Sequence, residues 1–329
     1  MTTPCAARRL AARPQHLRLL ALIALFAGAV GISLSPIFVR LADVGPLASA
    51  FWRTGLAVPF FLLPLLLPFM LPGHGSHGAS SRTERAAARL PRARRDWLLL
   101  ALAGGFFAAD LGVWHVSIGM TSVANATLFP NLAPVIVTLV AWLFFNERIG
   151  LHFVAGLVLA LTGAVIVIIN SAAASAHATV SNNNIGGDLL ALLVAFFYAG
   201  YLLAISRLRQ RLGVLSIMAF SSLFAALLLG AAALLLKGAA NMPLLPGTLG
   251  GLAALLGLAV VSQVVGQGLI AQALAHLPVS FSSLGLLLQP ALAAVFGWLW
   301  LHEALQPLQL AGMGIILLGI WLAQRTPQG

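Results

Sequence analysis

One pattern of five residues occurs twice in the chain, 156 positions apart. The second copy keeps every spacing of the first, so that Pro134, Trp142, Glu147, Gly156 and Gly163 correspond to Pro290, Trp298, Glu303, Gly312 and Gly319. Only three glutamates and seven tryptophans occur in the chain, which makes a chance match of both types a poor explanation. Each copy lies in strongly apolar sequence. A duplicated apolar half-chain is a frequent construction among membrane proteins that move solutes.

The composition places the chain in a membrane. Of its residues, 60% are apolar and only 8% are charged, and the mean hydropathy is +1.01. A water-soluble chain of this composition would have far too little polar surface to stay dissolved. Apolar runs of about 20 residues indicate helices that span a bilayer. The sequence contains ten such runs, at about 18–39, 46–71, 97–119, 122–145, 150–170, 188–206, 213–236, 248–273, 279–301 and 307–323. We therefore predict an all-α integral membrane protein with ten transmembrane helices.

The positive charges predict an orientation. With the N-terminus inside, 15 of the 18 Lys and Arg residues fall in cytoplasmic segments, six of them in the loop 72–96. The opposite side keeps only Arg40, Arg53 and Lys237. This bias predicts that residues 1–17 and 324–329 are cytoplasmic tails. The segment 171–187, which has no Lys or Arg, is then a periplasmic linker.

The two copies are predicted to have opposite orientations. The first repeat covers 18–170 and the second 188–323, with five helices each. Because five is an odd number, the second repeat enters the membrane from the other side. Such an inverted repeat has a pseudo-two-fold axis in the membrane plane. This symmetry gives two related states, each open to one side, around a site at mid-depth.

Several other classes are disfavoured. The net charge of +11 comes from arginines in short loops, which is typical of membrane orientation and not of a nucleic-acid surface. The partners expected are therefore the lipid bilayer and a small-molecule substrate, with the protein a monomer or homodimer. The single cysteine, Cys5, permits no disulfide within the chain. Four arginines before the first apolar run resemble a signal peptide, but the run continues to Val39, which is too long for one.

Two catalytic patterns are also absent. His302-Glu303 begins a zinc-protease motif, but position 306 is Gln306 where the second histidine would stand. No Gly-rich phosphate loop ending in Gly-Lys-Ser/Thr occurs. We therefore expect no enzyme activity, no metal and no other cofactor.

Three stretches carry a resemblance to a known family. SVANATLFPNLAPVIVTLVAWLFFNERIGLHFVAGLVLALTGAVIVI resembles an EamA-like repeat of the drug/metabolite transporter superfamily, and PVSFSSLGLLLQPALAAVFGWLWLHEALQPLQLAGMGIILLGIWL resembles the second copy. FWRTGLA is similar to the arginine-bearing second helix of that family. The resemblance implies two bundled halves, a central substrate cavity, and export or uptake of metabolites or drugs. The chain departs from the family in its long loop 72–96 and in His302, where the first copy has Asn146.

Two charged residues are the main candidates for a site within the membrane. Asp110 lies about 13 residues into its helix, ~20 Å from the inner end and ~13 Å from the outer end. An unpaired carboxylate there costs at least ~2.5 kcal/mol, so Asp110 is a candidate proton or amine site. Arg53 lies at a similar depth and can pair with Asp110 or bind a substrate carboxylate. His115 is about 140° away from Asp110 on the helix and is a weaker candidate for proton handling.

Uncharged polar and aromatic residues extend this candidate site. Their side chains either line the cavity or hold helices together, since amides facing lipid are costly. The amides are Asn125, Asn131, Gln263, Gln267 and Gln289, and the mid-helix aromatic residues are Trp114, Tyr198 and Tyr201. Tryptophans near helix ends instead indicate an interface belt.

Pro134 and Pro290 predict breaks in equivalent helices, which can act as gating elements. Glu147 and Glu303 follow these helices, and we interpret them as carboxylates stabilising the start of the next helix.

These observations predict a secondary transporter in a bacterial inner membrane. It would move a small organic metabolite, such as an amino acid or related compound, by alternating access. Export and proton coupling through Asp110 are the preferred direction and mechanism. Two alternatives remain open: a membrane enzyme acting on a lipid-linked substrate, and a channel-like passive facilitator.

Overall fold

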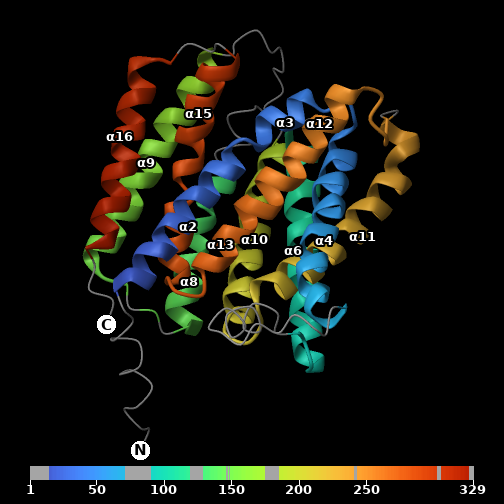
Figure 1. The fold of residues 1–329 in the computed structure, drawn as a ribbon. Coiled ribbons are helices and arrows are strands. Elements are labelled where there is room, and N and C mark those ends of the chain that lie inside the picture. Colours follow the sequence, from blue (N-terminus) through green and yellow to red (C-terminus); the bar gives the residue numbers. More distant parts are fainter. Residues whose placement is uncertain are drawn as a thin grey trace, which may run out of the picture.

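The computed structural model describes residues 15–70, 90–118, 129–145, 147, 149–174, 185–240, 243–301 and 305–325 of the 329. Every regular element in these ranges is a helix (Figure 1). In the first half they are α2 (Gln15–Ser33), α3 (Ser35–Leu41), α4 (Pro46–Met70), α6 (Arg94–Ile118), the 3₁₀ turn η1 (Phe129–Leu132), α8 (Ala133–Phe145) and α9 (Leu151–Ala174). In the second half they are α10 (Ile185–Leu208), α11 (Val214–Ala240), α12 (Leu249–Gly257), the π-helix η2 (Leu258–Gln267), α13 (Gly268–Ala273), α14 (Val279–Gly285), α15 (Leu288–Leu301) and α16 (Pro307–Gln324).

The predicted fold class is confirmed. Nine helical stretches of the described residues are long and apolar enough to cross a membrane, and a tenth, Phe129–Phe145, is apolar but shorter. They correspond to the ten apolar runs of the sequence. The start of α2 and the end of α16 lie at the same end of the bundle (Figure 1).

Helices of one repeat pack mainly against helices of the other. The first helix of the chain, α2, contacts η2 and α13, which belong to the eighth apolar run, and the sixth, α10, contacts the third, α6. Two further contacts join equivalent helices, α4 with α11 and α9 with α16. The pair α9 and α16 lies at one side of the molecule, and α4 with α11 lies at the other (Figure 1). The two repeats are therefore interlocked, and the space between them is lined by both.

The contact between α9 and α16 depends on glycines of the repeated pattern. A Cβ atom on Gly319 would lie 2.6 Å from the carbonyl oxygen of Gly156, and one on Gly163 would lie 2.6 Å from that of Gly312. The first glycine of each helix thus meets the second glycine of the other, so the two helices run antiparallel. Only glycine lets two backbones approach this closely.

Substituting Gly319 with leucine should therefore separate the two helices. We expect a fall in the melting temperature of the detergent-purified protein of about 5 °C or more, because the added side chain overpacks a closed contact. Gly314 is the matched control, since it lies on the same helix and a Cβ there would meet nothing within 4 Å. Equal melting temperatures for Gly319→Leu and Gly314→Leu would contradict the assigned contact.

Two of the described membrane helices are interrupted within their length. The first is interrupted at Leu34, between α2 and α3, and the ninth between α14 and α15. Pro290 lies in the first turn of α15, after the second of these interruptions, and Pro134 lies in the first turn of α8, directly after η1. By contrast, α4 continues without interruption through Pro59, Pro64 and Pro68. The interruptions bring loop-like backbone next to the cavity described below.

Candidate functional site

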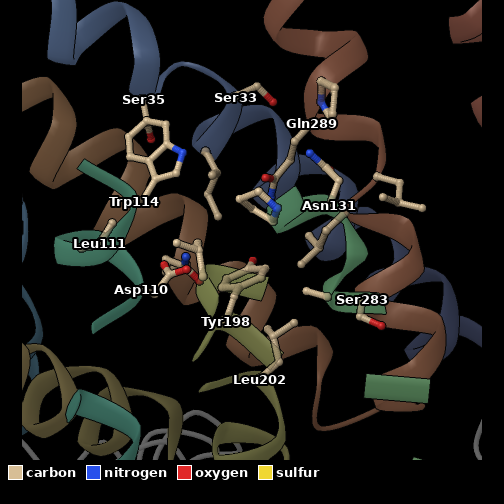
Figure 2. A pocket seen from close by; sticks show the side chains of 18 of the residues that line it. Ser33, Ser35, Asp110, Leu111, Trp114, Asn131, Tyr198, Leu202, Ser283 and Gln289 are labelled. Carbon is tan, nitrogen blue, oxygen red and sulfur yellow. The ribbon is translucent and has the colours of Figure 1, made fainter. Parts of the chain in front are cut away.

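A cavity of about 230 Å³ lies between the two repeats. Its walls come from α2, α3, α4, α6, η1 and α8 of the first half and from α10, η2, α14 and α15 of the second. Figure 2 shows Asp110, Trp114, Asn131, Tyr198 and Gln289 arranged around this space. Of the residues proposed from the sequence, Arg53, Gln267, Pro134 and Pro290 line it as well. The fold therefore brings most of the candidate residues proposed from the sequence together around this cavity.

Arg53 is held at the edge of the cavity. Its side chain is buried, with 7% of the residue exposed, and its Nε donates a hydrogen bond of 3.1 Å to Oε1 of Gln263. The guanidinium carbon lies 5.7 Å from the centre of the Phe107 ring, which gives a cation–π contact. Among the described residues, the structure records no hydrogen-bond partner for the two terminal nitrogens of Arg53. They are free to bind an anionic group in the cavity.

Asp110 shares this cavity with Arg53 but does not contact it directly. The two groups interact electrostatically. Within the described part of the chain, however, the only ion pair recorded at 4.0 Å or less is Arg211–Asp96, at 3.8 Å. The close Arg53–Asp110 pair considered from the sequence is thus absent from this conformation, in which the Nε of Arg53 donates to Gln263. Two groups of opposite charge thus line one cavity without forming an ion pair.

Aromatic rings form one side of the cavity. Phe107 stacks on Tyr201 with ring centres 4.6 Å apart, and Tyr201 stacks on Tyr198 at 6.3 Å. Tyr198 and Trp114 line the cavity, whereas Tyr201 is 1% exposed and supports the other rings from behind. The stack therefore presents an apolar wall next to Arg53. Phe107 was not proposed from the sequence because a buried phenylalanine in an apolar helix has no distinguishing pattern.

The amides occupy two layers. Asn131, Gln267 and Gln289 line the cavity. Gln263 lies behind that surface: it is fully buried, contacts Arg53, and donates from Nε2 to Oγ of Ser222 at 3.2 Å. Gln263 and Gln267 both come from η2, and π-helical segments are rare and frequently lie at functional sites.

Three serines that the sequence reasoning missed also line the cavity, namely Ser33, Ser35 and Ser283. Ser33 and Ser35 flank the interruption between α2 and α3. The sequence does carry a signal for them, because the stretch Ser-Leu-Ser-Pro ending at Pro36 interrupts an apolar run with small polar residues and a proline.

Two predicted residues lie outside what the structure describes. Asn125 is outside the described residues, and His115 belongs to α6 but its side chain is not described. Among the described residues there is no group of three or more His, Cys, Asp or Glu side chains that could hold a metal ion.

Glu147, which follows α8, joins the first repeat to the start of α14 in the second. Its Oε1 accepts a hydrogen bond of 3.0 Å from the backbone N–H of Val279, and its Oε2 accepts from the backbone N–H and the hydroxyl of Ser280. These donors form the first turn of α14. Glu147 does stabilise the start of a helix, as the sequence predicted. The helix, however, is α14 of the other repeat and not the adjacent α9. A carboxylate suits the positive end of a helix dipole.

Comparison with known proteins agrees with this architecture. The chain matches the EamA-like transporter family over residues 19–169 and 185–324, one match for each repeat. No curated protein matches it. Among 29 matching chains of solved structures, one titled only "Crystal structure of protein" has a TM-score of 0.71 at 16% sequence identity. That match covers 92% of this chain and 96% of the other, which supports the fold alone. The two family matches together cover most of the sequence, and the chain therefore belongs to the EamA-like transporter family, as a membrane transporter of the drug/metabolite type.

Proposed function

We propose that the protein is a secondary transporter of a bacterial inner membrane that exports a small zwitterion, an amino acid or related compound. The observation that carries this proposal is the pair Arg53 and Asp110, which face one cavity without direct contact. A carboxylate on the ligand would accept from the free nitrogens of Arg53, and an ammonium group would face Asp110. Both charges in the cavity would then be paired at once, which a ligand of single charge cannot achieve.

The cavity argues against strongly charged ligands. Arg53 and Asp110 are the charged residues among its described walls. A phosphate would meet one cation and one carboxylate, and a dication would meet Arg53. A molecule of no net charge fits best, and the size of about 230 Å³ suits a ligand of metabolite dimensions.

Alternating access is supported by the interlocked repeats. Equivalent helices α9 and α16 run antiparallel, as an inverted repeat requires, and we propose that the axis lies in the membrane plane with both termini cytoplasmic. Glu147 then lies at the cytoplasmic end, where its bonds to Val279 and Ser280 keep the two repeats together. Release of this contact would open the cavity toward the cytoplasm, and a closure at the other end would accompany it.

The experiment that tests the zwitterion proposal compares ligands that differ by one charge. The twenty L-amino acids are screened by the melting temperature of the purified protein, and the best one is tested for counterflow in proteoliposomes. The amine and the carboxylic acid of the same skeleton, each lacking one charge, are the controls. We expect the zwitterion to exchange and both controls to be at least about tenfold weaker, a difference of 1.4 kcal/mol. Equal exchange of the amine or the acid would contradict the two-charge site.

Direction is tested separately in everted membrane vesicles. We expect the zwitterion to accumulate in them under an imposed proton gradient, because everted vesicles take up what the cell exports. Accumulation in right-side-out vesicles instead would indicate uptake.

A further inference from the structure

Arg53 is oriented by a chain of two hydrogen bonds that crosses from one repeat to the other. Its Nε donates to Gln263 at 3.1 Å, and Gln263 donates in turn to Ser222 at 3.2 Å. The three residues are 7%, 0% and 1% exposed and come from α4, η2 and α11. We infer that Gln263 and Ser222 are positioning residues, which fix Arg53 so that its terminal nitrogens stay available for the carboxylate of the ligand. This inference rests on the proposed function.

The chemistry of the amide is what makes this role specific. A carboxylate at position 263 would hold Arg53 equally well, but it would neutralise the guanidinium and compete with the ligand. An amide oxygen accepts from Nε and leaves the positive charge unpaired. The Arg53 guanidinium only donates, so the amide oxygen Oε1 must face it. Ser222 accepts from Nε2 at the other end and holds the amide in that orientation.

The two repeats contribute unequal groups to Arg53. At the repeat spacing of 156, Gln263 corresponds to Phe107, and both residues contact the guanidinium, one by a hydrogen bond and the other through its ring. The backbones differ as well, since Gln263 lies in the π-helix η2 while the corresponding residues 102–111 are α-helical. The equivalent positions 107 and 263 of the two repeats thus hold an apolar and a polar side chain, and both contact the same arginine.

The test uses three variants and two measurements. Gln263→Glu keeps the shape of the side chain and adds a negative charge, and Ser222→Ala removes the hydroxyl that orients the amide. Ser221→Ala is the matched control, because the Ser221 hydroxyl donates to the carbonyl of Ile217 in its own helix and, among the described residues, no bond joins it to Gln263. The melting temperature of each purified variant is measured without ligand and with a mixture of the twenty L-amino acids.

We expect the amino acids to raise the melting temperature of the Ser221→Ala control as much as that of the wild type. In Ser222→Ala the rise should be about half or less, and in Gln263→Glu it should be absent. The apo melting temperature of Gln263→Glu should stay at or above that of the wild type, since Arg53 gains a partner. A purely structural Gln263 would leave the ligand shift unchanged, and that result would overturn the inference.

A second measurement decides the inference without any ligand. Ser222→Ala should lower the apo melting temperature of the wild type. In an Arg53→Met background the same substitution should lower the melting temperature by less, because Gln263 then has no guanidinium to hold. Equal costs in both backgrounds would overturn the chain of hydrogen bonds. If the amino acids do not stabilise the wild type, the proposed substrate is wrong. The positioning role of Gln263 and Ser222 is then decided by the comparison of the two backgrounds alone.

Discussion

Replacing Asp110 by asparagine is expected to abolish transport driven by a pH gradient. Asparagine has nearly the same shape but cannot bind and release a proton or pair with an ammonium group. Removing one partner of the charge pair that Asp110 would form with the ligand ammonium costs about 2–5 kcal/mol, so the flux into proteoliposomes should fall by about 30-fold or more. The measurement is uptake of the amino acid selected by the thermal screen, with and without an imposed pH gradient.

Asp96→Asn is the matched control for this prediction. Asp96 is a buried carboxylate of the same helix, α6, but it pairs with Arg211 and does not line the cavity. Its variant should retain the wild-type pH dependence. If Asp110→Asn also retains that dependence, Asp110 has no role in proton coupling.

Glu147→Gln is expected to expose the cavity to the cytoplasm. The change removes the charge from hydrogen bonds to Val279 and Ser280. Hydrogen bonds to a charged group contribute about 1.5–3 kcal/mol, so the population open on that side should rise by about tenfold or more. Ser283, which lines the cavity, is replaced by cysteine as a reporter in a chain whose Cys5 is serine. Its reaction with an impermeant maleimide is then followed in inside-out vesicles.

The control for this second prediction is Ser282→Ala. The Ser282 hydroxyl bonds to the carbonyl of Pro278 within the same segment and does not reach Glu147. Reporter labelling should be unchanged in this variant. If Glu147→Gln labels no faster than the control, the carboxylate does not hold the two repeats together at this end.

The fold was predictable from the sequence because hydropathy and repetition are both linear signals. Ten apolar runs and one repeated pattern are enough to specify ten helices in two repeats. That Arg53 and Asp110 lie well inside apolar helices was predictable for the same reason, since rise per residue converts sequence position into distance along a helix. Both residues line the cavity.

What could not be predicted depends on contacts between distant segments. Gln263 contacts Arg53 across 210 positions, and the π-helix that carries it changes which side chains share a face. Glu147 reaches Val279 across 132 positions instead of the helix that follows it. Neither partner can be read from spacing within one helix. The interruption at Leu34 was missed because the run from 18 to 39 is apolar on average, and an average conceals a local break.

The glycine pairs of α9 and α16 have one further consequence. Exchanging the two repeats turns the Gly156–Gly319 contact into the Gly312–Gly163 contact, so this junction is the same before and after such an exchange. A movement that swaps the roles of the repeats can therefore leave it in place as a fixed pivot. A covalent bridge across α9 and α16 should be compatible with repeated turnover, whereas a bridge across the Glu147 end should arrest it.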